Sequence, residues 1–275
     1  MDIKPYGKYA KAMIFLKWLL KAKTIDQLDS PILYEFYNQV VKSKVNRTQV
    51  ATIEQLRKSY LKNEQVIEIT DHGAGSATHP SKRRSIASIS GSAVSSASKC
   101  ELLYKTCQHF DYQRGLELGT SLGISALYMK YANPSADLTT IEGDPMIGRL
   151  AKPNLDKQNI RAIIGTFEKV LPTLQAEAVL YDLIYLDGGH RSDLIQKVMN
   201  TLHPITNRET VLIIDDIYWS PDMSGAWEKL KISQSYNVAI DLWHFGVLYY
   251  DQRAKEKIDV VMSPFDKRWT FGFFR

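Results

Sequence analysis

From residue 100 onward, short apolar runs alternate with longer stretches that carry apolar residues at helical spacing. The runs predict strands and the longer stretches predict helices. The predicted strands are 114–118, 137–142, 160–165, 181–187, 210–216, 237–243 and 247–250, and the predicted helices are 100–110, 122–132, 145–152, 166–176, 191–202 and 222–233. Apolar strands separated by helices are typical of a parallel sheet covered on both faces. Because only a short connection joins the last two strands, we expect an antiparallel edge strand. The pattern predicts an α/β fold with a doubly wound, mostly parallel, seven-stranded sheet, and such sheets bind ligands beyond the carboxyl ends of their strands.

The N-terminal part has a different pattern. Residues 5–65 show apolar positions at helical spacing, and Ser30-Pro31 is a typical helix start. Residues 66–70 form a strand candidate, which a glycine- and serine-rich stretch follows. We therefore expect a basic helical extension (1–65), a cap or loop segment (66–99) and a ligand-binding domain (100–275).

The composition is that of a globular protein, with 44% hydrophobic and 24% charged residues among 275. Cys100 and Cys107 would lie about two turns apart on one helix, too far to form a disulfide. A reducing cytoplasm is therefore the expected compartment. The apolar run 12–20 is too short to span a bilayer and is not followed by a cleavage signal, so neither an anchor nor a signal peptide is predicted.

Positive charge is concentrated at the N-terminus. Residues 1–65 hold 12 Lys and Arg against 6 Asp and Glu, whereas the remainder holds 23 against 24. The excess could attract an acidic partner, an anionic lipid surface or nucleic acid, or it could simply be a solvated helix face. Without zinc-finger or RNA-binding signatures, no specific nucleic-acid partner is expected. The apolar stripe of the first helix favours packing on its own domain or across a homodimer.

Two glycine-rich loops, ELGTSLGIS (117–125) and DHGAGS (71–76), compete as the nucleotide site. A nucleotide loop of this architecture needs a strand, a glycine turn, a helix, and an acid at the end of the next strand for the ribose. The loop at 117–125 has all of these, with Glu142 as the acid. No acid and no apolar strand follow DHGAGS within residues 85–99. The cofactor is therefore assigned to the loop at 117–125.

The motifs LELGTSLGIS and IEGDP resemble the first two motifs of the class I S-adenosylmethionine-dependent methyltransferases. In that family the glycine turn meets the methionine part of the cofactor, the acid after the second strand meets the ribose, and residues after the third strand meet the adenine. The resemblance implies these cofactor-binding residues: Glu117, Gly119, Thr120, Ser121, Gly123, Glu142, Gly143, Gly165, Thr166, Phe167 and Asp187.

Acidic residues also end two strands that should be neighbours. Asp187 and His190 follow one strand, and Asp215 and Asp216 end the next. Carboxylates brought together in this way repel one another, and a hard cation such as Mg²⁺ would relieve the repulsion. Aspartates are also common in turns after strands without binding any ligand.

The same spacing resembles the metal-dependent O-methyltransferases of the catechol and macrolide sugar types. The resemblance implies Asp187, Asp215 and Asp216 as metal ligands and His190 as the base, where the sugar type has histidine. The metal would lower the pKa of the acceptor hydroxyl and the histidine would take its proton. The implied acceptor is a small hydroxylated molecule, such as a sugar.

Two further segments are candidates for acceptor contacts. Tyr218 and Trp219 follow Asp216 directly and could form an aromatic lid. In the DHGAGS loop and the basic residues after it, His72, Arg83 and Arg84 could bind an acidic acceptor at an anion-binding turn, or the segment could be a solvated turn.

Two alternatives to a metal-dependent O-methyltransferase remain open. One is a metal-independent methyltransferase in which the aspartates are structural. The other is a noncatalytic protein that binds partners through its N-terminal helices. A nicotinamide dehydrogenase is disfavoured, because the loop lacks the G-x-G-x-x-G spacing.

Overall fold

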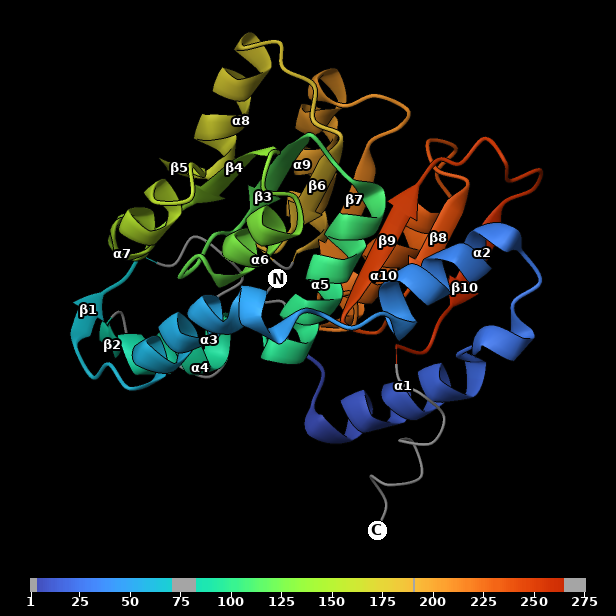
Figure 1. Cartoon of the computed structure of the whole chain (residues 1–275), viewed down its shortest axis with the longest axis horizontal. Helices are drawn as coiled ribbons and strands as arrows, with labels where there is room; N and C mark the ends of the chain where they lie inside the picture. Colours follow the sequence, from blue (N-terminus) through green and yellow to red (C-terminus); the bar gives the residue numbers. More distant parts are fainter. Residues whose placement is uncertain (1–3, 71–82, 190, 265–275) are drawn as a thin grey trace.

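The computed structural model describes residues 4–70, 83–189 and 191–264. Its centre is an eight-stranded sheet, and a separate two-stranded antiparallel sheet lies beside it (Figure 1). The strands are β1 (Val66–Glu68), β2 (Arg83–Ser85), β3 (Arg114–Leu118), β4 (Asp137–Glu142), β5 (Arg161–Ile164), β6 (Leu183–Leu186), β7 (Val211–Asp215), β8 (Val238–Asp241), β9 (Phe245–Tyr249) and β10 (Ile258–Val261). The α-helices are α1 (Lys8–Lys21), α2 (Pro31–Phe36), α3 (Arg47–Leu61), α4 (Ile86–Ala93), α5 (Ala97–Phe110), α6 (Ile124–Ala132), α7 (Pro145–Asp156), α8 (Phe167–Ala176), α9 (Ser192–Leu202) and α10 (Pro221–Lys231). The predicted α/β class is confirmed.

The central sheet has the strand order β10-β8-β9-β7-β6-β3-β4-β5. Only β9 runs antiparallel to its neighbours, β7 and β8. The prediction was therefore wrong on two details: the sheet has eight strands, and its antiparallel strand is internal. The reason is β10, a short run that pairs in parallel with β8 and extends the sheet beyond the closing hairpin.

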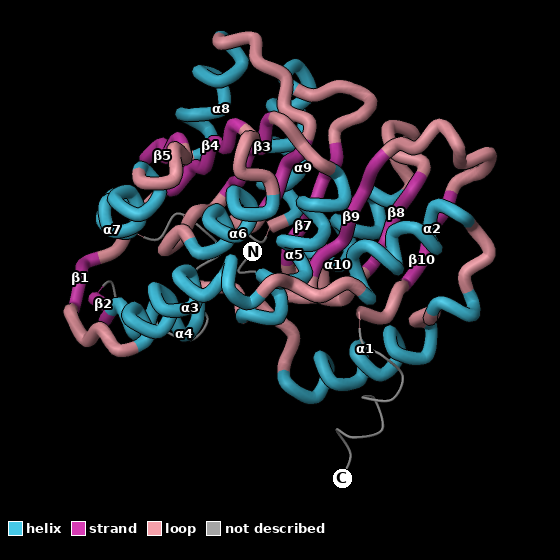
Figure 2. Tube along the Cα trace, in the orientation of Figure 1, coloured by secondary structure: helices cyan, strands magenta, loops and turns pink. Residues whose placement is uncertain are grey.

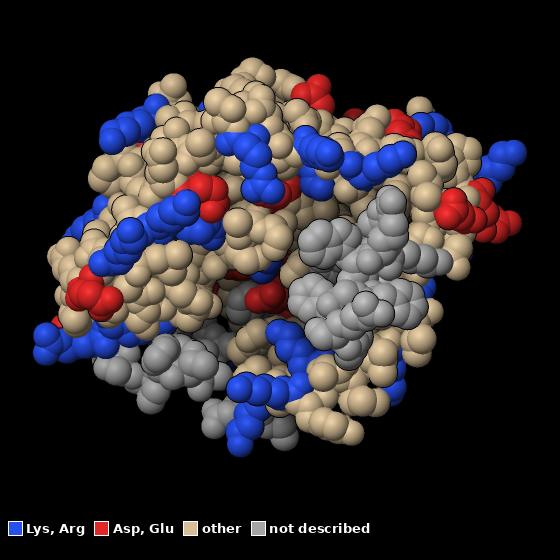
Figure 3. All heavy atoms as spheres, turned by 60° about the horizontal axis from the view of Figure 1, so that its bottom comes forward, with Lys and Arg blue, Asp and Glu red and all other residues tan. Residues whose placement is uncertain are grey.

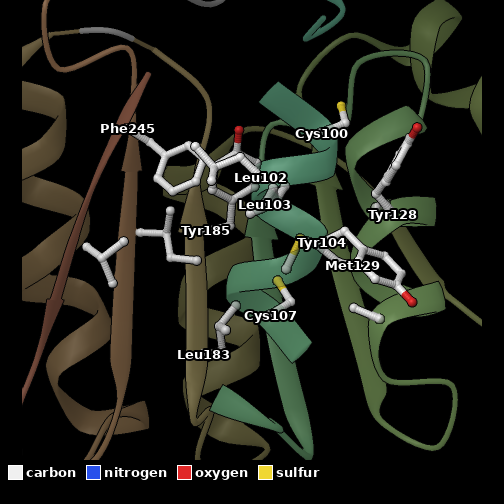
Figure 4. Close-up of a cluster of buried hydrophobic side chains, with 14 of the residues drawn as sticks. Cys100, Leu102, Leu103, Tyr104, Cys107, Tyr128, Met129, Leu183, Tyr185 and Phe245 are labelled. Carbon is white, nitrogen blue, oxygen red and sulfur yellow. The ribbon is translucent and has the colours of Figure 1, made fainter. Parts of the chain in front are cut away.

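Helices cover both faces of the sheet, as predicted (Figures 1 and 2). One apolar cluster joins a sheet face to α5, α6 and the N-terminal helices, and a second cluster joins the other face to α8, α9 and α10. Figure 4 shows α5 beside α6, and α5 contributes Leu103, Tyr104 and Cys107 to the first cluster. Cys100 and Cys107 are both buried and unbridged, as the sequence predicted.

The N-terminal helices pack on this frame. Trp18 of α1 is buried, and its indole N–H donates to Asp241 at the end of β8 over 2.7 Å. Lys23 forms a parallel bridge with Met262 beyond β10. Helix α4 was not predicted; it begins at the capping hydroxyl of Ser85 and buries Ile86 and Ile89. None of the described helices is long and apolar enough to cross a membrane.

Candidate active site

The glycine loop between β3 and α6 is closed tightly against the end of β6. Gly119 has φ +111° and Gly123, the residue before α6, has φ +80°, a region that glycine tolerates best. A Cβ atom on Gly119 would stand 2.2 Å from the backbone oxygen of Asp187. The loop can therefore follow this path only with glycine at 119, and it lies directly against the backbone of Asp187.

Glu117 lies beneath this loop and is fully buried. Its Oε2 accepts a 2.5 Å hydrogen bond from the Thr140 hydroxyl, which is also 2.6 Å from the hydroxyl of Thr120. Burial raises the pKa of Glu117 to about 7. These residues support the loop from inside the fold.

Glu142 ends β4 beside the same loop. Its two carboxylate oxygens accept from the backbone N–H of Ser121 (2.7 Å) and of Asp144 (2.9 Å). Burial raises the pKa of Glu142, and the backbone N–H groups of Asp144, Ser121 and Gly143 oppose the rise. The carboxylate is thus held at the rim where the first two motifs meet.

A small pocket opens between the glycine loop and the connection from α4 to α5. It encloses about 190 Å³, including space open to solvent. Its lining residues are Ala93, Val94, Ser95, Thr120, Ser121, Leu122, Ile124, Ser125 and Asp187. The hydroxyl of Ser121 is buried and has no hydrogen-bond partner among the residues that the structure describes. A polar ligand in this pocket would satisfy it.

Arg57 of α3 fixes the wall of this pocket from behind. Its guanidinium is buried and donates to the backbone oxygen of Ser95 and to Sγ of Cys100, the latter over 3.3 Å. A further hydrogen bond of 3.0 Å runs from Nε to Glu54. The N-terminal helices therefore contribute to the geometry of the pocket.

The residues expected near an adenine lie at the start of α8. Thr166 is its N-cap and Phe167 its first residue. A Cβ atom on Gly188 would lie 2.9 Å from Cζ of Phe167, so the phenyl ring packs against the turn after β6. A Cβ on Gly165 would meet Val170 at 2.8 Å. This segment thus reaches the same rim as Asp187.

The carboxylates after β6 and β7 converge as the sequence predicted. The strands pair in parallel with Leu186 opposite Ile214, which sets Asp187 beside Asp215. Asp216 follows with φ +50°. Figure 3 shows a hollow near the middle of one face in which acidic and basic atoms meet.

Lys99, in the first turn of α5, lies among these carboxylates. Its ammonium nitrogen forms an ion pair with Asp215 and a second with Asp216 over 3.2 Å. Burial opposes the charged ammonium, but Asp215, Asp216 and Asp187 together raise the pKa of Lys99. Burial and the neighbouring Asp215 raise the pKa of Asp187 well above its ordinary value. Within residues 4–70, 83–189 and 191–264, no group of three or more His, Cys, Asp and Glu is arranged to hold a metal ion.

The aromatic residues after Asp216 pack beneath α1. Tyr218 donates a 2.5 Å hydrogen bond to Asp241 and stacks on Trp243, with ring centroids 4.9 Å apart. The backbone oxygen of Trp219 accepts from the N–H of Tyr6 over 3.0 Å. Their predicted contact with an acceptor stays a prediction.

The other predicted acceptor residues lie in two places. The guanidinium of Arg84 is buried against α4, where it donates to the backbone oxygen of Ser88 over 3.1 Å and to the hydroxyl of Ser92. Arg83 is exposed on β2, opposite Glu68. His72 and the predicted base His190 lie outside the described residues. An acceptor role for these residues stays a prediction.

Four residues of the site were missed in the sequence. Ser125 was detectable, since it stands in the first turn of the helix that follows the glycine loop. Lys99 and Arg57 carried no local signal, because their partners are remote in the chain. The fourth, His244, lies close to Lys99, Asp215 and Asp216, and its pKa is lowered by burial and by Lys99.

Residues 116–217 match the family model of a methyltransferase domain. In sequence, the chain is similar to O-methyltransferase imqG of Aspergillus flavus, with 33% identity over 75 residues. That match covers 26% of this chain and 30% of the relative, so the chain spans less than a third of the curated protein it matches.

Two solved structures share the fold. One is SAH-bound methyltransferase PaMTH1 of Podospora anserina, with TM-score 0.53, 12% identity, and coverage of 92% of this chain and 100% of that chain. The other is the O-methyltransferase from Bacillus cereus in complex with SAH, with TM-score 0.51, 13% identity, and coverage of 82% and 98%. Residues 116–217 are therefore similar to a methyltransferase domain, and the chain shares its overall fold with these two methyltransferase structures.

Proposed function

We propose that the chain is an S-adenosylmethionine-dependent O-methyltransferase that acts on a small hydroxylated acceptor. The observation that carries the proposal is the pocket beside the glycine loop, with the buried hydroxyl of Ser121 in its wall. Asp187 also lines the pocket, and Glu142 accepts a hydrogen bond from the backbone N–H of Ser121 in its wall. The methyltransferase resemblance of the sequence assigns both residues to the cofactor.

In this proposal the pocket holds the amino-acid end of the cofactor. The pocket is much smaller than a complete ligand site, so in this proposal it meets only part of the molecule. The hydroxyls of Ser121 and Ser125 and the carboxylate of Asp187 are the polar groups that meet this end. The remaining proposed cofactor contacts are Glu142 and Gly143 for the ribose, Gly165, Thr166 and Phe167 for the adenine, and Glu117, Gly119, Thr120 and Gly123 as the loop that shapes the site.

The reaction joins the acceptor oxygen to the methyl carbon while the carbon–sulfur bond breaks and S-adenosylhomocysteine leaves. The sulfonium methyl is already activated, so the main task of the protein is to align the oxygen behind it. We propose His190 as the base that takes the hydroxyl proton, Asp187, three positions earlier in the sequence, as the second catalytic group, and Tyr218 and Trp219 as contacts of the acceptor. His72, Arg83 and Arg84 remain proposed acceptor contacts, and a sugar is the proposed acceptor.

The Mg²⁺ ion that the sequence favoured does not fit the surroundings of Asp187, Asp215 and Asp216. The ammonium group of Lys99 already contacts one oxygen of Asp215 and one of Asp216, which are the carboxylates proposed to hold a divalent ion. No step is therefore assigned to a metal, and the metal-independent alternative is favoured at this site.

The exposed stripe of α1 supports the proposed homodimer. Tyr9, Met13, Leu16 and Leu20 follow helical spacing and are 41–82% exposed. Light scattering should give twice the chain mass for the wild type and the monomer mass for a Leu16→Glu, Leu20→Glu variant. A monomeric wild type would refute the dimer and leave the enzymatic proposal intact.

The function is tested by titrating the protein with S-adenosylhomocysteine in a calorimeter. We expect one site per chain, a markedly weaker site in Glu142→Ala, and an unchanged site in Glu168→Ala, which removes an exposed acid from α8. Transfer of a labelled methyl group from S-adenosylmethionine to a panel of sugars and phenols then distinguishes an enzyme from a noncatalytic binder. A protein that binds no S-adenosylhomocysteine would contradict the proposal.

A further inference from the structure

The positively charged side chain of Lys99 lies within the acidic cluster formed by Asp187, Asp215 and Asp216. The side chain of Asp215 is completely buried and that of Lys99 is 10% exposed. Asp216, the other ion-pair partner, is 38% exposed and faces the rim. The pairing therefore connects the buried end of β7 to the open side of the site.

The position of this ammonium group is fixed by several contacts of α5. The backbone N–H of Lys99 donates to the capping hydroxyl of Ser96 over 3.3 Å. The next residue, Cys100, is buried, and its sulfur accepts a hydrogen bond from Arg57. Lys99 thus lies in the first turn of a helix that is held by the Ser96 cap and by the contact between Cys100 and Arg57. Its position is therefore more restricted than that of a surface lysine.

A divalent ion and this ammonium group exclude one another. Mg²⁺ binds oxygen at about 2.0–2.1 Å, so an ion held by Asp215 and Asp216 would lie against the nitrogen that already pairs with both. Two cations at that separation repel strongly in a buried site. Asp215 and Asp216 can therefore bind either the Lys99 ammonium group or a divalent ion, but not both.

We propose that Lys99 is a built-in replacement for a divalent cation, so that this protein binds no metal at Asp187, Asp215 and Asp216. Lys99 acts as a positioning residue: it holds Asp215 and the turn at Asp216 in place next to Tyr218 and Trp219, the proposed contacts of the acceptor. The catalytic meaning of this arrangement rests on the proposed methyltransferase function, whereas the exclusion of metal does not.

The test is a calorimetric titration of MgCl₂ into protein that has first been saturated with S-adenosylhomocysteine. Wild type and Lys99→Arg, which keeps the charge, should show no saturable heat. Lys99→Ala should gain one saturable Mg²⁺ site, and Mg²⁺ should raise its melting temperature by several degrees. The gained site should vanish in Lys99→Ala, Asp215→Asn.

Lys105→Ala is the matched control. Lys105 is a partly buried lysine of the same helix that donates to the backbone oxygens of Val41 (3.4 Å) and Ser43 (3.3 Å), away from the carboxylates. It should lose some stability but gain no Mg²⁺ site. A lysine that was merely structural would behave in the same way at position 99.

The outcomes separate clearly. Saturable Mg²⁺ binding by the wild type that is lost in Asp215→Asn overturns the proposal. A folded Lys99→Ala that gains no Mg²⁺ site also overturns the proposal. If Lys99→Ala does not fold, Lys99→Met provides a second neutral variant for the same titration. Failure of S-adenosylhomocysteine to bind would count against the proposed function, while the same Mg²⁺ titration of the unliganded protein still decides the role of Lys99.

Discussion

Substitution of Gly119 by alanine tests how tightly the glycine loop is held against the end of β6. The backbone has φ +111° at this position, where a side chain costs about 1–3 kcal/mol of strain. The new Cβ would stand 2.2 Å from the backbone oxygen of Asp187 and 2.7 Å from its carbon, and relieving such overpacking costs about 1–3 kcal/mol more. The expected loss is roughly 2–6 kcal/mol, or a fall in melting temperature of about 5–20 °C.

Thermal unfolding followed by circular dichroism measures the loss, and calorimetry with S-adenosylhomocysteine measures its effect on the site. We expect the folded fraction of Gly119→Ala to bind the ligand more weakly, because the Asp187 turn must move away from the loop. Gly225→Ala is the control, since no atom lies within 4 Å of its Cβ position on the exposed side of α10. It should be neutral or stabilised by up to about 1 kcal/mol. Equal melting temperatures for Gly119→Ala and the wild type would refute the reasoning.

Three further predictions follow from buried groups. The pKa of Glu117 is raised to about 7, so the folded state holds a proton that the unfolded state releases near pH 4.5. The free energy of unfolding should therefore fall as pH rises from about 5 to 8. Melting curves of Glu117→Gln should show a smaller change over the same pH range. Tyr218→Phe removes a hydrogen bond to the buried Asp241 and should cost about 1–3 kcal/mol of unfolding free energy by denaturant titration, with unchanged S-adenosylhomocysteine affinity; an unchanged midpoint would contradict this. Arg57→Met frees the backbone oxygen of Ser95 in the pocket wall and should lower both the melting temperature and the affinity for S-adenosylhomocysteine, and full retention of both would show that the wall needs no such support.

The sequence was sufficient for the parallel core of the fold. Strands 114–118 and 137–142 are bounded by turns, and their observed bounds match the predicted ones. The neighbouring strands β6 and β7 have apolar residues at successive positions because both of their faces are buried, which makes their signal strong. The adjacency of β6 and β7 was also predictable, and with it the convergence of Asp187 and Asp215.

Elements that depend on remote partners could not be predicted. Helix α4 has a serine-rich sequence of low helix propensity, and its stability comes from the burial of Ile86 and Ile89. Strand β10 follows a charged segment and becomes a strand by pairing with β8. In both cases tertiary packing outweighs the local pattern.

In the candidate site, too, the residues with a local sequence signal were predictable and those that depend on remote partners were not. Loop and strand-end residues such as Gly119 and Glu142 carry their signal in neighbouring sequence. Lys99 and Asp216 are 117 positions apart, so nothing in the local sequence of either residue indicates the other. The carboxylate cluster was therefore found from the sequence, while the ammonium group that pairs with Asp215 and Asp216 required the structure.

The most direct test of the account is a crystal structure of the protein with S-adenosylhomocysteine, grown in the presence of MgCl₂. We expect the ribose at Glu142, the amino-acid end in the pocket beside Ser121 and Ser125, and the Lys99 ammonium group still paired with Asp215. Ligand density away from the glycine loop, or a metal ion bound by Asp187 and Asp215 with Lys99 displaced, would contradict it.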